Sequence, residues 1–150
     1  MLKKLTIISL VALVGLPSCV DLTKEQKSKL QAVKTTMPDH YMEEKNPNLA
    51  AGLGVLPLGI ADFYNGNIGL GVANIFGSLI WPFNLSWTIV GGVDGANERN
   101  YYATKAHLNQ VKKKELDALE EKLNEKKITE SKYVTESKKI ERKYDMDYIM

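Results

Sequence analysis

Glycine is confined almost entirely to one stretch of this 150-residue chain, because ten of the 11 glycines lie between Gly52 and Gly95. Composition changes at the borders of that stretch: residues 19–46 are polar, residues 47–97 are apolar, and residues 98–150 are highly charged. Such a split favours a compact apolar module with polar arms over one uniform globule. We expect a mainly α fold, with a glycine-rich helical hairpin followed by a charged helical arm that ends in a two-helix element.

The chain begins with lysines and an apolar run, residues 3–16, which is typical of a secretory signal and too short to span a bilayer comfortably. It closes with the tetrapeptide LPSC at residues 16–19, which resembles the lipobox of bacterial lipoproteins, although Pro17 replaces the usual Ala, Ser, Thr or Val. The resemblance implies a signal peptide at residues 1–18, diacylglycerol on the Cys19 sulfur and acylation of its new amine. The alternative is an ordinary signal peptide, or an uncleaved anchor, with an incidental cysteine.

Lipidation predicts that residues 19–150 stay on a membrane, held by lipid on Cys19. It also accounts for a lone cysteine, which has no partner for an internal disulfide. Many lipoproteins of the inner membrane have aspartate directly after the cysteine, whereas this chain has Val20 there and Asp21 one place later. We therefore expect an outer-membrane location facing the periplasm.

Charge argues against nucleic acid as a partner. The formal net charge of +2 falls to zero when Lys3 and Lys4 leave with the signal, because 18 basic and 18 acidic side chains remain. A neutral chain has no long-range field that would attract phosphates. The basic triplet at residues 112–114 precedes several acidic residues and is interpreted as a solvated helix face.

Two helix starts can be read before the apolar module. Thr23 and Gln26 fit a capping box, and the helix that follows ends before Pro38. We interpret this helix as a spacer from the lipid, with a partner-binding helix as the alternative. Asn46 followed by Pro47 is typical of the start of a second helix.

The segment GIADFYNGNIGLG, residues 59–71, is similar to the turn of the small two-helix transmembrane hairpin domain of bacterial membrane proteins. Gly59, Phe63, Tyr64 and Gly66 match the turn of that family, whereas Asp62 replaces its usual basic residue. The resemblance implies an apolar helical hairpin with an aromatic turn and transfers no activity. Because polar residues and Gly dilute the second run, we expect partial immersion in one leaflet rather than a full span.

Small residues recur at four-residue intervals in the hairpin. Gly69, Ala73 and Gly77 share one helical face, as do Ala50 and Gly54. Such faces let two helix backbones approach closely, so we predict helix packing there. The alternative is that these glycines merely loosen a loop.

The C-terminal region predicts a charged helix over about residues 102–126, a break at residues 127–129 and a second helix. Residues 119–144 resemble the SHOCT type of short C-terminal domain, although Lys126 and Lys127 stand where that family commonly has glycine. The resemblance implies an interaction or oligomerisation element. An unspecialised charged helical hairpin is the alternative.

The sequence contains few candidate catalytic residues. The two histidines, His40 and His107, are isolated in the sequence and lack the spacing of a metal motif, so we expect no metal site, no cofactor and no catalytic residue. Asp62 is interpreted as a turn-capping residue, with proton handling as the alternative. The sequence favours a non-catalytic envelope protein of structural or adaptor type that binds another envelope protein or a second copy of itself. The rival hypothesis is a membrane-active, self-associating lipoprotein that blocks or remodels a pore or transporter, as phage-exclusion lipoproteins do.

Overall fold

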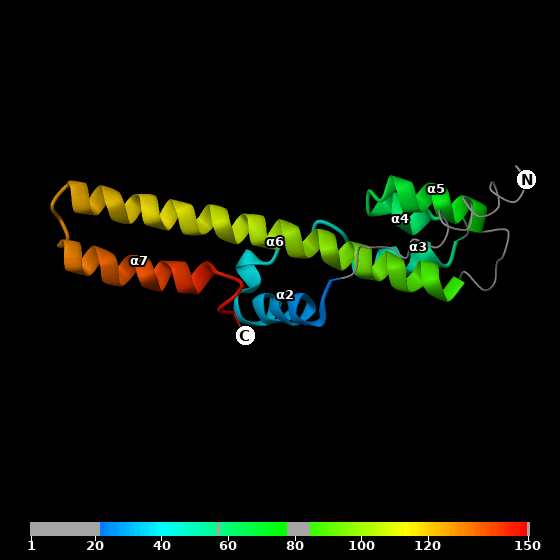
Figure 1. Ribbon diagram of the computed structural model, residues 1–150, viewed down its shortest axis with the longest axis horizontal. Coiled ribbons are helices and arrows are strands. Elements are labelled where there is room, and N and C mark those ends of the chain that lie inside the picture. The colour runs from blue at the N-terminus through cyan, green and yellow to red at the C-terminus, as the bar shows by residue number, and fades with distance from the viewer. Residues whose placement is uncertain (1–21, 57, 78–84, 150) are drawn as a thin grey trace, which may run out of the picture. The chain divides into compact units, whose positions relative to one another are not determined.

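The structure is a computed structural model that describes residues 22–56, 58–77 and 85–149. These residues form helices and no strand, which confirms the mainly α fold (Figure 1). Within them, no helix combines the length and the apolar character needed to cross a membrane. The elements in chain order are α2 (Lys24–Thr36), the 3₁₀ turn η1 (Pro38–His40), α3 (Pro47–Gly54), α4 (Ile60–Tyr64), α5 (Ile68–Gly77), α6 (Leu85–Asn124) and α7 (Glu130–Tyr144).

The chain divides into two compact units. The first unit contains residues 44–99, and the second unit contains residues 23–43 together with residues 100–149. Helix α6 supplies residues to both. The polar segment that contains α2 belongs to the same unit as the C-terminal helices, where Lys29 Nζ lies 2.8 Å from Asp147 Oδ1. Its role as a spacer from the lipid stays a prediction.

Both predicted helix starts before the module are confirmed. Thr23 Oγ1 accepts a hydrogen bond from the Gln26 N–H at 3.2 Å, and Gln26 Oε1 accepts one from the Thr23 N–H at 2.9 Å. Asn46 Oδ1 accepts from the Leu49 N–H at 3.0 Å, with Pro47 at the first helical position. Side chains thus satisfy backbone donors that a helix start leaves free.

Helices α3 and α6 pack backbone to backbone in the first unit, through small residues. A Cβ added at Gly54 would lie 2.7 Å from the Ile89 Cα, and one added at Gly92 would lie 2.8 Å from the Ala50 carbonyl oxygen. The Thr88 hydroxyl also donates to the Gly54 carbonyl at 2.7 Å. The predicted role of Ala50 and Gly54 in helix packing is confirmed.

Helix α6 begins at Leu85. The prediction that this helix starts near residue 102 is therefore wrong. The helix runs through Gly91, Gly92 and Gly95, which lie before the predicted start. Of these, Gly92 and Gly95 pack closely against Ala50 and Asn65. Tertiary packing here outweighs the low helix propensity of glycine, which is about 1 kcal/mol per residue.

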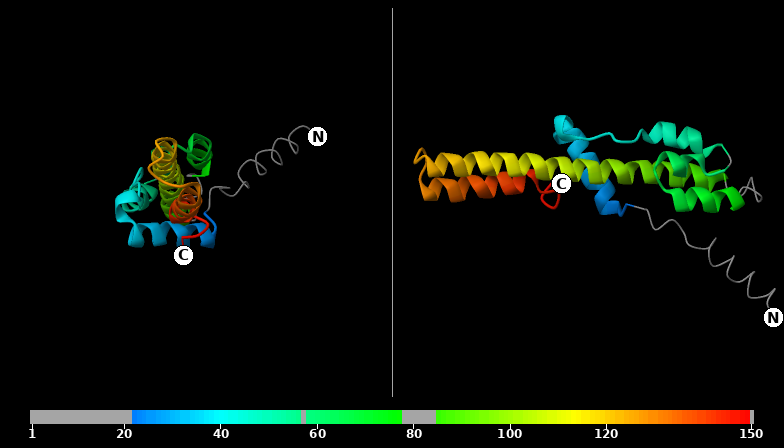
Figure 2. Two further views of the ribbon diagram at one scale, coloured as in Figure 1. Left: turned by 90° about the vertical axis from the view of Figure 1, so that its left-hand side faces the viewer. Right: turned by 90° about the horizontal axis from the view of Figure 1, so that it is seen from above.

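The second unit contains the α6–α7 hairpin, whose two helices run side by side and are joined by a tight turn (Figures 1 and 2). Lys126, two residues after the end of α6, has a φ of 56°. The Lys127 N–H donates to the Lys122 carbonyl and the Lys126 N–H donates to the Leu123 carbonyl, both at 2.9 Å. This pattern is a Schellman motif with lysine at the position that favours glycine. The α7 helix then begins after Thr129, whose hydroxyl accepts from the Lys132 N–H at 3.4 Å.

Candidate functional site

Two glycines of the hairpin turn adopt left-handed backbone conformations. Gly59, directly before α4, has a φ of 66°, and Gly66 has a φ of 80°. A Cβ at Gly59 would also lie 2.7 Å from the Gly71 carbonyl oxygen. Backbone geometry and close packing both explain why glycine occupies position 59.

The two aromatic residues of the turn have different surroundings. The Phe63 ring covers Gly71, where an added Cβ would lie 2.7 Å from Phe63 Cε1, and yet Phe63 remains 41% exposed. The Tyr64 hydroxyl accepts from the Asn46 N–H at 3.0 Å, and Lys45 Nζ lies 4.7 Å from the Tyr64 ring centroid. Phe63 thus joins α4 to α5, while Tyr64 ties α4 to the start of α3.

Asp62 is the only charged residue between positions 47 and 93, and it is buried. Asn74 on α5 donates from Nδ2 to Asp62 Oδ2 at 2.6 Å. Burial raises the pKa of Asp62, and the hydrogen bond from Asn74 partly opposes that rise. This carboxyl group therefore lies inside the unit, joining α4 to α5, and the exposed surface from residue 47 to residue 93 carries no charge in its described part.

Asn65 is a structural residue whose role the sequence did not reveal. The pair Asn65-Gly66 suggests a turn that tolerates positive φ, but only Gly66 adopts one. Asn65 is fully buried instead, donating from Nδ2 to the Gly92 carbonyl at 2.8 Å, and its own carbonyl accepts from Arg99 Nε at 2.8 Å. It therefore anchors the hairpin turn on α6.

The outer side of α5 is apolar. We use the name α5 face for Ile68, Val72 and Phe76, which recur every four residues and are 68%, 45% and 64% exposed. On the other side of the helix, Gly71 meets Phe63 and Asn74 meets Asp62. Other exposed large apolar side chains of the first unit are Leu49, Val55, Leu56, Leu58, Ile60, Ile75 and Val90. Large uncharged surfaces of this kind mark membrane or protein contacts.

Among the described residues, no neighbouring helix covers Gly69, the first of the predicted packing residues of α5. A Cβ at Gly69 would meet no atom within 4 Å, whereas one at Gly71 would collide with Phe63. Ala73 is half-buried, and the surroundings of Gly77 lie outside the described residues. Close packing inside the chain thus involves Gly71, and a role for Gly69, Ala73 and Gly77 between two copies stays a prediction. Cys19, the predicted lipidation site, also lies outside the described residues.

The second unit brings the two histidines together, although 67 residues separate them in the sequence. His40 Nδ1 lies 3.4 Å from His107 Nε2, and their ring centroids are 5.6 Å apart. Tyr144 of α7 meets the His40 ring edge-on at 5.6 Å and donates its hydroxyl to Glu115 Oε1 at 2.5 Å. No local spacing signals this arrangement. The described residues contain no group of three or more His, Cys, Asp or Glu side chains that could hold a metal ion.

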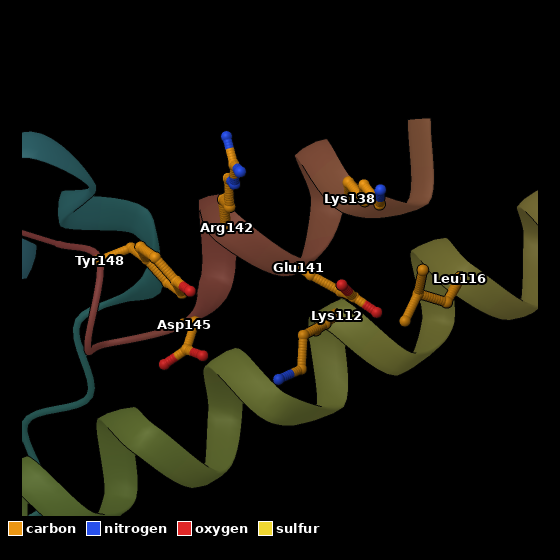
Figure 3. Close-up of a pocket in the computed structure, with 7 residues that line it drawn as sticks. All are labelled: Lys112, Leu116, Lys138, Glu141, Arg142, Asp145 and Tyr148. Atoms are coloured by element: carbon orange, nitrogen blue, oxygen red, sulfur yellow. The ribbon is translucent and has the colours of Figure 1, made fainter. Parts of the chain in front are cut away.

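A groove of about 460 Å³ lies along the α6–α7 hairpin, lined by Lys112, Leu116, Lys138, Glu141, Arg142, Asp145 and Tyr148. Glu141 reaches from α7 toward α6, whereas Arg142 points away from α6 (Figure 3). The charges have mixed signs and their side chains do not converge on one point. The groove therefore offers neither a cradle for an anion nor a paired acid and base.

No known family model matches the chain, and no curated protein or solved structure matches it. The resemblances to the lipobox, the transmembrane hairpin domain and the SHOCT domain stay predictions from their motif residues.

Proposed function

We propose that this chain is a lipid-anchored adaptor of the bacterial cell envelope. In this proposal, lipid on Cys19 attaches the chain to a membrane, and the α5 face turns the first unit toward the bilayer surface. The charged α6–α7 hairpin of the second unit stays in water, where another envelope protein binds it. The observation that carries the proposal is the exposed, uncharged α5 face.

The relative energies assign different roles to the lipid and to the α5 face. Acyl chains contribute about 0.8 kcal/mol per buried methylene. Summed over the methylenes of whole acyl chains, this contribution exceeds what a few side chains can supply. A fully buried Ile, Val or Phe side chain contributes about 1.5–3 kcal/mol, and the side chains of the α5 face are already partly covered. We therefore expect the lipid to hold the protein on the membrane and the α5 face to orient it.

The surfaces of the two units support this division. Exposed charged side chains follow one another along the α6–α7 hairpin, among them Lys113, Lys114, Lys138 and Lys139 with Glu120, Glu121 and Glu141. Charges of both signs keep such a surface in water and favour a protein partner over a lipid surface. The first unit lacks exposed charge between residues 47 and 93 over its described part.

A single environment-sensitive label tests the orientation. Acylation occupies the sulfur of Cys19, so Cys introduced by Val72→Cys is the only free thiol of the lipidated protein. Val134→Cys is the matched control, because Val134 of α7 is 49% exposed and Val72 is 45% exposed. In vesicles we expect the label at position 72 to be quenched by lipid-borne quenchers and the label at position 134 by aqueous iodide.

Two results would contradict the proposed orientation. Equal iodide quenching at both positions would show that the α5 face stays in water. Protection of position 72 together with efficient short-span cross-linking between Val72→Cys copies would favour the rival self-associating lipoprotein.

The anchor itself is tested separately. We expect Cys19→Ser to abolish incorporation of labelled palmitate and to block processing at the signal, because the variant has no thiol to acylate. Unchanged palmitate labelling would refute the lipoprotein assignment. Ser18→Ala, which keeps a small residue beside the cysteine, is the control and should label like the parent.

A further inference from the structure

The contact between His40 and His107 has an unusual length for a hydrogen bond. Their facing nitrogens, His40 Nδ1 and His107 Nε2, are 3.4 Å apart. Hydrogen bonds from a protein N–H are usually 2.7–3.2 Å long between heavy atoms. Two imidazole nitrogens bound to one tetrahedral zinc ion, each at 2.0–2.1 Å, stand about 3.3–3.4 Å apart. The observed separation is therefore long for a hydrogen bond and matches the spacing of two imidazole nitrogens on one ion.

The surroundings of the pair hold one ring in place and leave both histidines partly open to solvent. Tyr144 packs edge-on against the His40 ring, and its hydroxyl is fixed by Glu115. Lys143 Nζ lies 4.5 Å from the centroid of the Tyr144 ring, so this cation is associated with Tyr144. Both histidines are half-buried, which leaves access to solvent on one side. Water can therefore fill the coordination positions that the protein leaves open.

We propose that His40 and His107 form a two-imidazole site for a divalent transition-metal ion of the zinc, nickel or copper class. Imidazole nitrogen suits these ions. Ligation uses the lone pairs of His40 Nδ1 and His107 Nε2, so the proton of each neutral ring resides on its other nitrogen. With two protein ligands and water elsewhere, the affinity is lower than that of a closed structural zinc site with four.

The ion would tie η1 to α6 across 67 residues of sequence. Because the two nitrogens face each other only when the second unit is folded, binding would stabilise that unit, and the gain would rise with the logarithm of the ion concentration above the Kd. The site is independent of the proposed membrane orientation.

Titration of the intact lipidated protein in detergent micelles, purified without a histidine tag, tests the site. The chain contains only two histidines, so His40→Gln and His107→Gln each remove half of all its imidazole ligands. We expect calorimetric titration with ZnCl₂ to give one ion per chain and each variant to bind at least about tenfold more weakly, because chelation is lost. Zn²⁺ should raise the Tm of the parent and not that of either variant, and Mg²⁺ should raise neither.

Paramagnetic resonance of Cu²⁺ bound to the parent gives a readout that does not depend on the folding of the variants. Two imidazole nitrogens in the hyperfine pattern are expected. One nitrogen or none, or a His107→Gln variant that is folded and binds Zn²⁺ as tightly as the parent, would overturn the proposal.

Discussion

The described cores of the two units are built from side chains of different size. In the second unit large side chains are buried, including Val33, Leu108 and Tyr144. In the first unit alanine and glycine occupy the tightest contacts, as at Ala50 and Gly92, while Ile, Val, Leu and Phe side chains face outward. Side-chain volume thus fills one core, and close backbone approach forms the other. Helix α6, one continuous helix, therefore takes part in both kinds of packing.

The largest expected effect is in the second unit. Leu108 is fully buried, so Leu108→Ala leaves a cavity and should lower the free energy of unfolding of that unit by about 2–5 kcal/mol. Urea denaturation with hydrogen exchange resolved by unit measures it. Val134→Ala, at an exposed position, should change the free energy by less than about 0.5 kcal/mol. Similar losses in the two variants would break the contrast between a filled core and an exposed surface.

In the first unit, we expect an increase in side-chain volume to lower stability, whereas in the second unit a decrease does so. Gly54→Ala would force a Cβ to within 2.7 Å of the α6 backbone at Thr88 and Ile89, and should cost about 1–3 kcal/mol. Gly52 lies on the same helix with nothing within 4 Å of its added Cβ, so Gly52→Ala should be stabilising by about 0.5–1 kcal/mol. Thermal unfolding of both variants gives the comparison. A stable Gly54→Ala protein would show that α3 and α6 can separate without penalty.

Asp62 should make the stability of the first unit depend on pH. Burial raises the pKa of Asp62 in the folded state. Between the unfolded and folded pKa values, the folded state therefore binds more protons than the unfolded state. The free energy of unfolding thus falls as the pH rises from about 3.9 through the folded pKa. Asp62→Asn should remove this fall and raise the stability of the first unit at neutral pH by on the order of 1 kcal/mol. Urea denaturation from pH 3 to pH 8 measures it. Asp117→Asn, at an exposed position of the second unit, is the control, and an unaltered pH profile in Asp62→Asn would contradict the expectation.

The smallest effect concerns the turn of the α6–α7 hairpin. Lys126 has a left-handed backbone, so Lys126→Gly should relieve strain and stabilise the second unit by about 0.5–1 kcal/mol. Lys127→Gly is the matched control, because Lys127 has no positive φ and gains only unfolded-state freedom. A difference in Tm between these two variants measures the strain. Equal values would mean that the lysine adopts this conformation at no cost.

Local signals predicted the features that local chemistry determines. The caps at Thr23 and Asn46 depend on side chains within three residues of the backbone groups they satisfy. The four-residue spacing of Ala50 and Gly54 was likewise sufficient, because both residues lie on one side of a single helix.

Features that depend on contacts between distant parts of the chain could not be predicted from local sequence patterns. Spacing alone favoured Gly69 on α5, but the position of Phe63 makes Gly71 the packed glycine. The start of α6 was missed because the close approach of Gly92 to the Ala50 backbone, which favours glycine within this helix, joins residues 42 positions apart. The His40–His107 pair was missed because the fold brings together residues 67 positions apart.

The opposite packing of the first unit has a consequence for how its sequence can change over evolution. At Gly54 and Gly92 selection acts on size, because any side chain would collide with a backbone. On the α5 face selection acts on polarity alone, because Ile68, Val72 and Phe76 face outward and require no particular shape. Related chains should therefore keep the glycines at the helix contacts while exchanging one apolar residue for another on the outer side of α5.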